Sequence, residues 1–352
     1  MNRIAYLDTL KGICILLVVF CHYPLLPENS FIGNIIMTLA WAAVPCFMMI
    51  TGNLLQRSRS FIWTKYLKRL IVTYFTIVFW KAVYYFVYHY MIPASTSTID
   101  LVQYLFFFKP LDYIQDGVMW YMNAYLMIML LYPVLHYLMK NNINLYLYLL
   151  FLSFFSGIVI PSLDFIAKAI FDRLINGSFS VEGVNVIFPF IQWGNMLFFF
   201  LLGGYLSNVE TKIRQTIKNW IIPLVFILAG GSLLMIVKKI DSGTFLWRGI
   251  YIENGYSHFA TVIMSIGLYE FFAMIKENRF LLFIGHLWGK TTMGIYYLHF
   301  LFLGVLNITL FPIWHIQGSL LVNLIKTLFI STACSAITII CRKIPVIRIF
   351  FK

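Results

Sequence analysis

Charged residues are scarce in this chain. Lys, Arg, Asp and Glu together make up 11% of its 352 residues, whereas hydrophobic residues make up 61%. Soluble proteins carry about 25% charged residues, and one buried core does not enclose this many apolar side chains. The composition therefore excludes an ordinary soluble protein. It predicts an all-α polytopic membrane protein in which residues 1–352 form a single integral-membrane domain.

Acidic residues are the rarer kind of charge, because 13 Asp and Glu stand against 26 Lys and Arg, a net charge of +13. Such an excess can indicate binding to nucleic acid. The basic residues lie in short segments between apolar runs, however, and the preference of cytoplasmic loops for positive charge explains them better. We therefore expect the lipid bilayer, and no nucleic acid, among the partners.

Several chemical signatures are also missing. The chain has no G-x-x-x-x-G-K-[ST] phosphate loop, no H-E-x-x-H pair and no G-x-S-x-G elbow. Its seven histidines form no close cluster, and its five cysteines show no spacing typical of metal ligands. We therefore expect no metal, and we expect the cysteines to pack inside membrane segments.

Apolar runs predict about ten transmembrane helices, since a bilayer requires roughly 20 residues per helix. The predicted spans are 8–26, 32–55, 67–91, 117–139, 143–161, 186–206, 219–237, 257–275, 291–310 and 319–341. The N-terminus shows no cleavage pattern of a signal peptide, so the first apolar run is expected to remain as a span.

Basic residues set the expected orientation. The second, sixth and eighth connections and the C-terminal tail hold Arg57, Arg59, Lys65, Lys68, Arg69, Lys212, Arg214, Lys218, Lys276, Arg279, Lys290, Arg342, Lys343, Arg348 and Lys352. With ten spans these fall on one side, which we assign to the cytoplasm together with both termini. Three longer outer connections lie near 92–116, 162–185 and 238–256. The last two are candidates for short surface helices or part of a substrate vestibule.

The first span carries three ionisable residues. Lys11 and His22 are eleven positions apart, about three helical turns, which places them on nearly the same stripe about 16 Å apart. Asp8 lies three residues before Lys11 and can pair with it. Taken alone, Lys11 is explained by a long side chain whose ammonium group reaches the membrane interface. Taken alone, His22 is explained as a polar side chain with a hydrogen-bond partner. The shared stripe favours function, because an imidazole that titrates near pH ~6.5 can accept a proton.

Other polar residues in the predicted spans are further candidates. Trp120 also fits an interfacial aromatic belt, whereas the amide of Asn123 needs a partner inside the membrane. His299 lies about halfway along the ninth span, where an imidazole usually faces the bundle interior in a structural or a functional role. His258 begins the eighth span, where contact with a polar acceptor and a solvated loop fit equally well.

Five segments, in order, carry a resemblance to a known family. They are AYLDTLKGICILLVVFCH, VPCFMMITGNLL, MWYMNAYLMIMLLYP, FFFLLGGYLSN and GKTTMGIYYLHF. Their order over nearly the whole chain resembles the type 3 membrane O-acyltransferases, multi-span bacterial enzymes that acylate sugars and cell-envelope polymers. Lys11 stands where the family usually has Arg. Of the paired Arg residues that often enter its third span, the chain has Arg69, with Tyr66 at the other position. The chain is similar to the single-domain branch, which lacks an appended extra-cytoplasmic hydrolase-like domain.

The resemblance implies a multi-pass protein of the bacterial inner membrane that takes an acyl group, most often acetyl, from cytoplasmic acyl-CoA. The acceptor would be a hydroxyl group of a glycan or lipid-linked sugar. His22 is the expected general base or acyl carrier, and Lys11, oriented by Asp8, is expected to hold the donor or offset negative charge near it. The expected substrate-binding residues are Lys65, Lys68, Arg69, Trp120, Asn123, His258 and His299.

Two other classes of protein also explain ionisable residues within the membrane spans. A transporter or flippase of a lipid-linked sugar has ionisable groups within its spans, although this sequence shows no repeated halves and no matched pair of broken helices. A non-catalytic assembly partner of a polysaccharide synthase would need no chemistry at His22.

Overall fold

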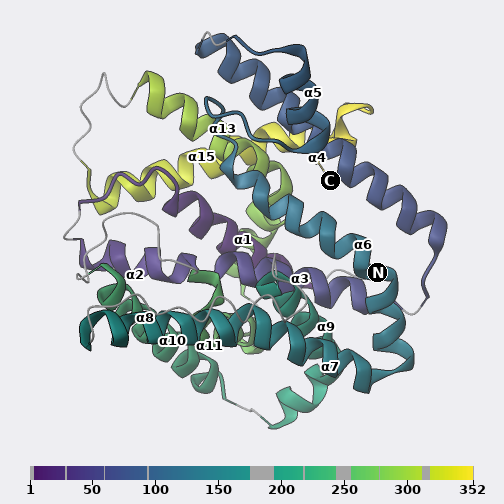
Figure 1. Ribbon diagram of the computed structural model, residues 1–352, viewed down its shortest axis with the longest axis vertical. Coiled ribbons are helices and arrows are strands. Elements are labelled where there is room, and N and C mark those ends of the chain that lie inside the picture. The colour runs from purple at the N-terminus through teal and green to yellow at the C-terminus, as the bar shows by residue number, and fades with distance from the viewer. Residues whose placement is uncertain are drawn as a thin grey trace.

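The computed structural model describes residues 4–27, 30–58, 60–92, 95–174, 194–216, 219–242, 255–276, 278–310 and 318–351. Within these ranges every regular element is a helix or a helical turn (Figure 1). The first elements are α1 (Ala5–Cys21), α2 (Phe31–Ala40), α3 (Ala43–Gln56), α4 (Trp63–Met91), α5 (Thr98–Phe107), η1 (Gly117–Met119), α6 (Trp120–Asn141), α7 (Ile143–Phe154), η2 (Phe155–Val159) and α8 (Ile160–Leu174). Then follow α9 (Gly194–Thr216), α10 (Ile221–Ser242), η4 (Gly255–Ser257), α11 (Phe259–Met274), α12 (Arg279–Ile284), η5 (Gly285–Gly289), α13 (Thr292–Thr309), α15 (Leu320–Cys341) and η6 (Ile347–Phe351).

Seven helical stretches among the described residues are long and apolar enough to cross a membrane, and an eighth results if α11 and the α12–η5 segment form one bent span. The seven are Phe31–Gln56, Trp63–Met91, Gly117–Asn141, Ile143–Ala169, Ile221–Ile240, Thr292–Thr309 and Leu320–Cys341. Three of the ten predicted spans correspond to shorter helices, namely α1, the apolar Gly194–Val209 part of α9, and α11. The protein is therefore a polytopic membrane protein whose described residues form helices without strands.

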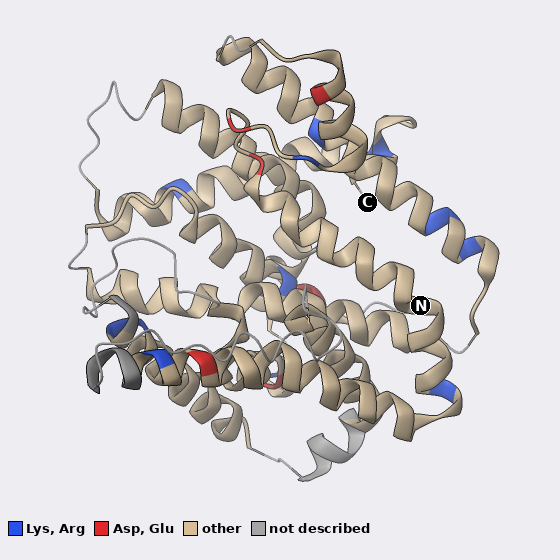
Figure 2. Cartoon of the chain, viewed as in Figure 1, with Lys and Arg blue, Asp and Glu red and all other residues tan. Residues whose placement is uncertain are grey.

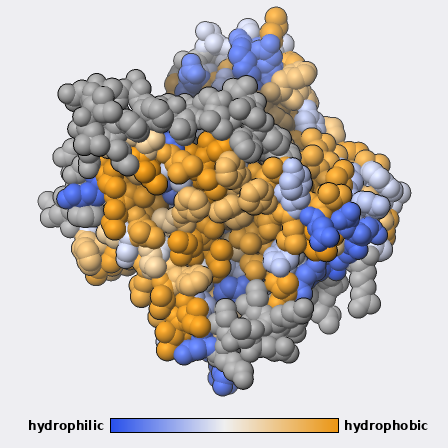
Figure 3. All heavy atoms as spheres, turned by 60° about the horizontal axis from the view of Figure 1, so that its bottom comes forward, coloured by the Kyte–Doolittle hydropathy of each residue, from blue (hydrophilic) through white to orange (hydrophobic). Residues whose placement is uncertain are grey.

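The surface of the bundle is apolar and its interior is partly polar. Phe31, Phe86 and Phe329 are each about 70% exposed. Figure 3 shows hydrophobic side chains across most of the visible face. By contrast, Lys326 is buried and His299 is fully enclosed. This inversion is expected where lipid surrounds the helices and polar groups find partners inside the bundle.

Helix α1 lies in the middle of the bundle, in contact with α2, α3, α11, α13 and α15 (Figure 1). Its packing against η5 requires glycine. A Cβ on Gly289 would lie 1.9 Å from the carbonyl oxygen of Asp8, and a Cβ on Gly12 would lie 2.8 Å from that of Ile284. Small residues of this kind let helix backbones approach closely inside a membrane. The close approach fixes the Asp8 end of α1 against α12 and η5.

One predicted connection contains helices, and one predicted boundary is wrong. The connection expected at 276–290 lies between α11 and α13 as predicted, and its residues 279–289 form α12 and η5, which pack against α1. The fifth predicted span, 143–161, continues through the π-helical turn η2, and its apolar stretch reaches Ala169. A helix satisfies its own backbone hydrogen bonds, so it continues past positions where composition alone suggests an end.

The long outer connections are described only in part. Residues 162–174 belong to α8, whereas 175–185 lie outside the described residues. Residues 243–254 of the third connection also lie outside them. In the first connection the structure shows α5, which the sequence did not predict.

The tail after α15 folds back onto α4. Arg342 donates two hydrogen bonds from its guanidinium to the carbonyl oxygen of Phe351. The ring of Phe350 stacks on that of Phe79 with 4.2 Å between ring centroids. The tail was expected to be only a run of cytoplasmic positive charge. It is instead a packed element that carries Arg348 toward α4.

Candidate active site

Two histidines from distant parts of the chain lie together inside the bundle. His22 directly follows α1, and His299 lies within α13. Their ring centroids are 5.3 Å apart with 64° between the ring planes. Phe300 packs edge-on against His22 with 5.1 Å between ring centroids. The sequence predicted both histidines as site residues, and the structure brings them into contact.

Both imidazoles are held through the same ring atom. Nδ1 of His22 lies 2.6 Å from the carbonyl oxygen of Val18, and Nδ1 of His299 lies 2.9 Å from that of Ile295. Because a carbonyl oxygen only accepts hydrogen bonds, each Nδ1 must carry the proton and donate. In a neutral ring Nε2 is then the basic atom. Nε2 of His299 is buried and has no hydrogen-bond partner among the described residues.

Helix α15 holds the end of α1 that precedes His22. Lys326 donates from Nζ to the carbonyl oxygens of His22 and Tyr23, at 2.9 Å and 3.0 Å. Asn323, one turn earlier, donates from its amide to the carbonyl oxygen of Phe20 at 3.2 Å. The last carbonyls of a helix have no partner within it, and a cation complements the negative end of the helix dipole. These two side chains therefore fix the position of the His22 backbone.

Tyr23 turns the chain away from α1. Its φ of 45° lies in the left-handed region, which non-glycine residues rarely adopt. Its hydroxyl donates to Oε1 of Gln115, beside Asp116. Asp116 accepts from Nζ of Lys81 at 2.9 Å and from the hydroxyl of Tyr104 at 3.0 Å. Burial and the adjacent carboxylate raise the pKa of Tyr104, so its hydroxyl stays protonated as a donor.

The predicted ion pair is present in the first turns of α1. Nζ of Lys11 lies 3.3 Å from Oδ1 of Asp8, and the two side chains are 24% and 16% exposed. The pair stands at the opposite end of α1 from His22, where Gly289 packs against the Asp8 backbone. The structure thus separates the predicted catalytic residues into an ion pair at one end of α1 and an imidazole at the other.

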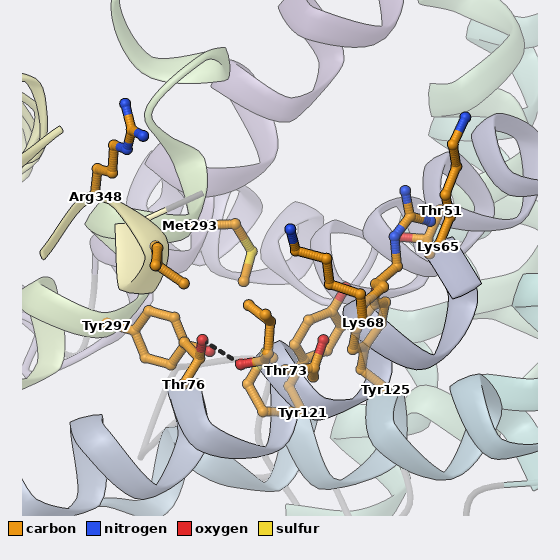
Figure 4. Close-up of a pocket in the computed structure, with 14 residues that line it drawn as sticks. Thr51, Lys65, Lys68, Thr73, Thr76, Tyr121, Tyr125, Met293, Tyr297 and Arg348 are labelled. Atoms are coloured by element: carbon orange, nitrogen blue, oxygen red, sulfur yellow. Dashed lines mark hydrogen bonds between the residues drawn. The ribbon is translucent and has the colours of Figure 1, made fainter. Parts of the chain in front are cut away.

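A cavity of about 660 Å³ lies between α4, α6, α13 and η6. Four of its lining residues are cationic, Lys65, Lys68 and Arg69 of α4 and Arg348 of η6, and none is acidic. Basic residues gather at the N-terminal end of α4 (Figure 2). Figure 4 shows the side chains that line this cavity. Lysine and arginine in such a group suit an anionic ligand, phosphate above all.

The uncharged lining of the cavity is rich in hydroxyl groups. Tyr121 and Tyr125 come from α6, and Tyr297 comes from α13 (Figure 4). The Tyr297 hydroxyl is buried without a hydrogen-bond partner among the described residues. Its ring stacks on that of Trp80 with 4.9 Å between ring centroids. The cavity therefore combines cations with an aromatic wall that offers polar contacts.

Tyr296 stands between this cavity and the histidine pair. Neither histidine lines the cavity. The ring centroid of Tyr296 is 5.6 Å from that of Tyr121 on the cavity wall and 6.4 Å from that of His299. Its hydroxyl donates to the carbonyl oxygen of Val118. Tyr296 therefore connects the wall of the cavity with His299 through direct ring contacts.

Three predicted site residues have other surroundings. Trp120 packs against Tyr256 with 5.4 Å between ring centroids. Oδ1 of Asn123 is buried without a hydrogen-bond partner among the described residues. His258 precedes α11, is 3% exposed and packs edge-on against Phe165. The solvated-loop interpretation of His258 is therefore wrong.

The sequence reasoning missed Lys326, Arg348 and Tyr296. Lys326 interrupts an apolar span, and a lone cation at such a position is itself a sign of function. Arg348 was counted only as tail charge, although the neighbouring IRIFF stretch is too apolar for a solvated tail. Tyr296 lies within the GIYYLHF segment. Nothing in the sequence around it distinguishes a residue beside a cavity from a residue packed in the core.

The described part of the chain thus defines a polytopic membrane protein with a cation-lined cavity near a buried histidine pair. No group of three or more His, Cys, Asp or Glu side chains in this part is arranged to hold a metal ion. A family model described as an acyltransferase domain matches residues 4–341, and the chain belongs to this type 3 acyltransferase family. No curated protein and no solved structure matches the chain. The protein is a membrane acyltransferase.

Proposed function

We propose that the protein moves an acyl group, most simply acetyl, from acyl-CoA to a hydroxyl group of a glycan or lipid-linked sugar. The observation that carries the proposal is a cavity with four cations near a histidine pair, with Tyr296 in ring contact with Tyr121 of the cavity lining and with His299. The cations suit the phosphates of CoA. The histidines suit the removal of a proton from an alcohol that attacks a thioester.

The proposed orientation brings donor and acceptor from opposite sides of the membrane. The proposal counts α1, α9 and α11 as spans in addition to the seven long helices, and this count of ten gives both termini a cytoplasmic position. Positive-inside topology then puts Lys65, Lys68 and Arg69 on the cytoplasmic side, where acyl-CoA is available. His22, at the other end of α1, faces the outer half of the bilayer. A lipid-linked sugar or exported polysaccharide of the bacterial inner membrane presents its hydroxyl groups there.

His22 is the proposed general base. Its Nδ1 is bound to the Val18 carbonyl, so Nε2 takes the proton of the acceptor hydroxyl as the oxygen bonds to the thioester carbonyl carbon. The tetrahedral intermediate then breaks its C–S bond, and the proton passes from Nε2 to the leaving CoA sulfur. General base catalysis of this kind contributes about 10²–10⁴ in rate.

The remaining predicted residues have supporting roles in this proposal. Lys11, oriented by Asp8, offsets negative charge of the donor at the cytoplasmic end of α1. His299 accepts a hydrogen bond from the acceptor at its unpartnered Nε2, and Asn123 does the same at Oδ1. Trp120 and His258 lie on the side from which the acceptor approaches.

The test is ester formation by the purified protein in detergent. Labelled acetyl-CoA is incubated with the protein and candidate glycans, and ester products are separated and weighed by mass spectrometry. An acyltransferase yields acylated glycan in the absence of any membrane compartment. A transporter or flippase of lipid-linked sugars yields none. Sugar movement across vesicles without ester formation would contradict the proposal.

A second arm separates catalysis from a role in assembly. Envelope glycans of cells with the native protein are compared with those of cells with the His22→Ala variant. The proposal predicts that the variant loses one ester mass per modified sugar while the protein remains inserted. A non-catalytic partner of a polysaccharide synthase would leave the ester pattern intact.

A further inference from the structure

A second, smaller cavity adjoins the cation-lined one. It has a volume of about 250 Å³, and it shares Lys65 and Arg69 with the larger cavity. Aromatic side chains line it from three places in the chain, namely Phe61 before α4, Tyr66 in the first turn of α4 and Tyr132 in α6. We call this space the aromatic cavity.

The three aromatic rings form a rigid set. The ring centroid of Phe61 is 5.4 Å from that of Tyr66 and 5.8 Å from that of Tyr132. The rings are tilted by 40° to 47° to one another, so no two of them stack face to face. The hydroxyl of Tyr132 donates to the carbonyl oxygen of Leu55 at 2.9 Å, which fixes the position of its ring.

Charge and aromatic surface together indicate the ligand chemistry. Aromatic side chains bind planar nucleobases by stacking, and adjacent Lys and Arg bind the phosphates attached to the sugar. Ser58 and Ser60 add polar groups to the lining, and the Ser58 hydroxyl donates to the Ser60 carbonyl at 2.9 Å. None of the described residues that line the aromatic cavity is acidic. The combination suits a phosphorylated purine nucleoside.

We infer that the aromatic cavity binds the adenine base of the CoA donor. Lys65 and Arg69, which border both cavities, then hold the adenosine phosphates at the junction. The pantetheine arm runs through the larger cavity toward Tyr296. This inference rests on the proposed function, because it assigns a place to one part of the proposed donor.

The inference is tested by dividing the donor into its two ends. Binding of adenosine 3′,5′-bisphosphate and of phosphopantetheine is measured by calorimetry on the purified full-length protein. The variants are Tyr66→Leu and Phe61→Leu, each with an aromatic control, Tyr66→Phe and Phe61→Tyr. We expect each Leu variant to bind adenosine 3′,5′-bisphosphate about 5- to 100-fold more weakly, the range typical of base stacking. Phosphopantetheine affinity should change less than about twofold, and the aromatic controls should keep native affinity for both compounds.

Several outcomes would overturn the inference. Unchanged affinity for adenosine 3′,5′-bisphosphate in both Leu variants would place the base elsewhere. Equal loss for both compounds in both Leu variants would show a general disturbance of the donor site instead of a base pocket. Displacement of an anionic lipid, with no binding of adenosine 3′,5′-bisphosphate, would identify the cavity as a lipid site.

The experiment also distinguishes this inference from the proposed function. Binding is measured without catalysis, so nucleotide affinity that depends on Tyr66 supports the pocket even if no ester forms. Conversely, ester formation with a Tyr66→Leu variant that keeps native nucleotide affinity supports the function and rejects the pocket. Acetyl-pantetheine, a donor without the adenosine phosphates, adds a kinetic check. Its KM should be the same for the native protein and for Tyr66→Leu.

Discussion

The ring of His299 lies edge-on to the ring of His22, with 5.3 Å between the two ring centroids. Each ring donates from Nδ1 to a backbone carbonyl oxygen four residues earlier, so Nε2 is the basic atom of each neutral ring. His299 is fully buried, whereas His22 is partly exposed at the end of α1. We therefore assign proton transfer to His22 and binding of the acceptor to His299.

The role of His299 predicts a graded loss of transfer. His299→Gln keeps a hydrogen-bond acceptor of similar reach, so we expect its rate of ester formation to fall by less than about tenfold, the scale of losing one neutral hydrogen bond. His299→Ala removes the acceptor and leaves a void, so its rate should fall further. Initial rates with labelled acetyl-CoA measure both variants. A native rate in His299→Ala would exclude His299 from acceptor binding.

The contacts of Lys326 with the His22 backbone predict that its substitution lowers turnover without weakening donor binding. Lys326→Met removes the two hydrogen bonds to the carbonyls of His22 and Tyr23 while it keeps most of the side-chain volume. We expect kcat to fall about 10- to 100-fold, because displacement of a reacting group by about 1 Å has an effect of this size. KM for acetyl-CoA should stay within about twofold, and Lys326→Arg should recover part of kcat. A stability loss with native kcat would mean that Lys326 is structural only.

Arg348 predicts an effect on donor affinity. Both Arg348 and Lys343 are exposed residues of the tail, but only Arg348 lines the larger cavity. Arg348→Ala should raise KM for acetyl-CoA about tenfold, since a hydrogen bond to a charged group contributes about 1.5–3 kcal/mol. Lys343→Ala removes the same charge from the tail and should leave KM unchanged. Equal effects of the two substitutions would indicate general electrostatic attraction instead of a contact in the cavity.

Gly289 predicts a packing effect on stability. A Cβ at this position would lie 1.9 Å from the carbonyl oxygen of Asp8, so α1 and η5 would have to separate. We expect Gly289→Ala to destabilise the protein by about 1–3 kcal/mol, the range for overpacked positions. Gly117→Ala is the control, because a Cβ there meets nothing within 4 Å. Thermal unfolding in detergent compares the two variants, and an equal Tm would contradict the packing account.

Much of the helical framework follows from local sequence patterns. Apolar runs indicate where helices form because a chain in lipid must satisfy its backbone hydrogen bonds within each segment. The Asp8–Lys11 pair follows from its spacing of three residues, and the structure confirms it. The segment 276–290 was predicted only as a connection with basic residues, and the helices α12 and η5 within it were not predicted. Its glycines allow close packing against α1.

The candidate site depends on contacts that no local pattern specifies. His22 and His299 were each selected for their place in a span, but their contact results from the packing of α1 against α13. Lys326 and Arg348 join the site through α15 and the folded tail. The spacing of charged residues along the chain shows which side chains are unusual in a membrane. It does not show which helices meet.

The most direct test of the account is acyl transfer by His22→Ala. The variant is purified, its fold is checked by thermal unfolding, and its binding of CoA is compared with that of the native protein. It is then incubated with labelled acetyl-CoA and an accepted glycan. The account predicts native CoA affinity and ester formation at least about 100-fold slower than with the native protein, the smallest loss expected when a general base is removed. Ester formation at the native rate would contradict it.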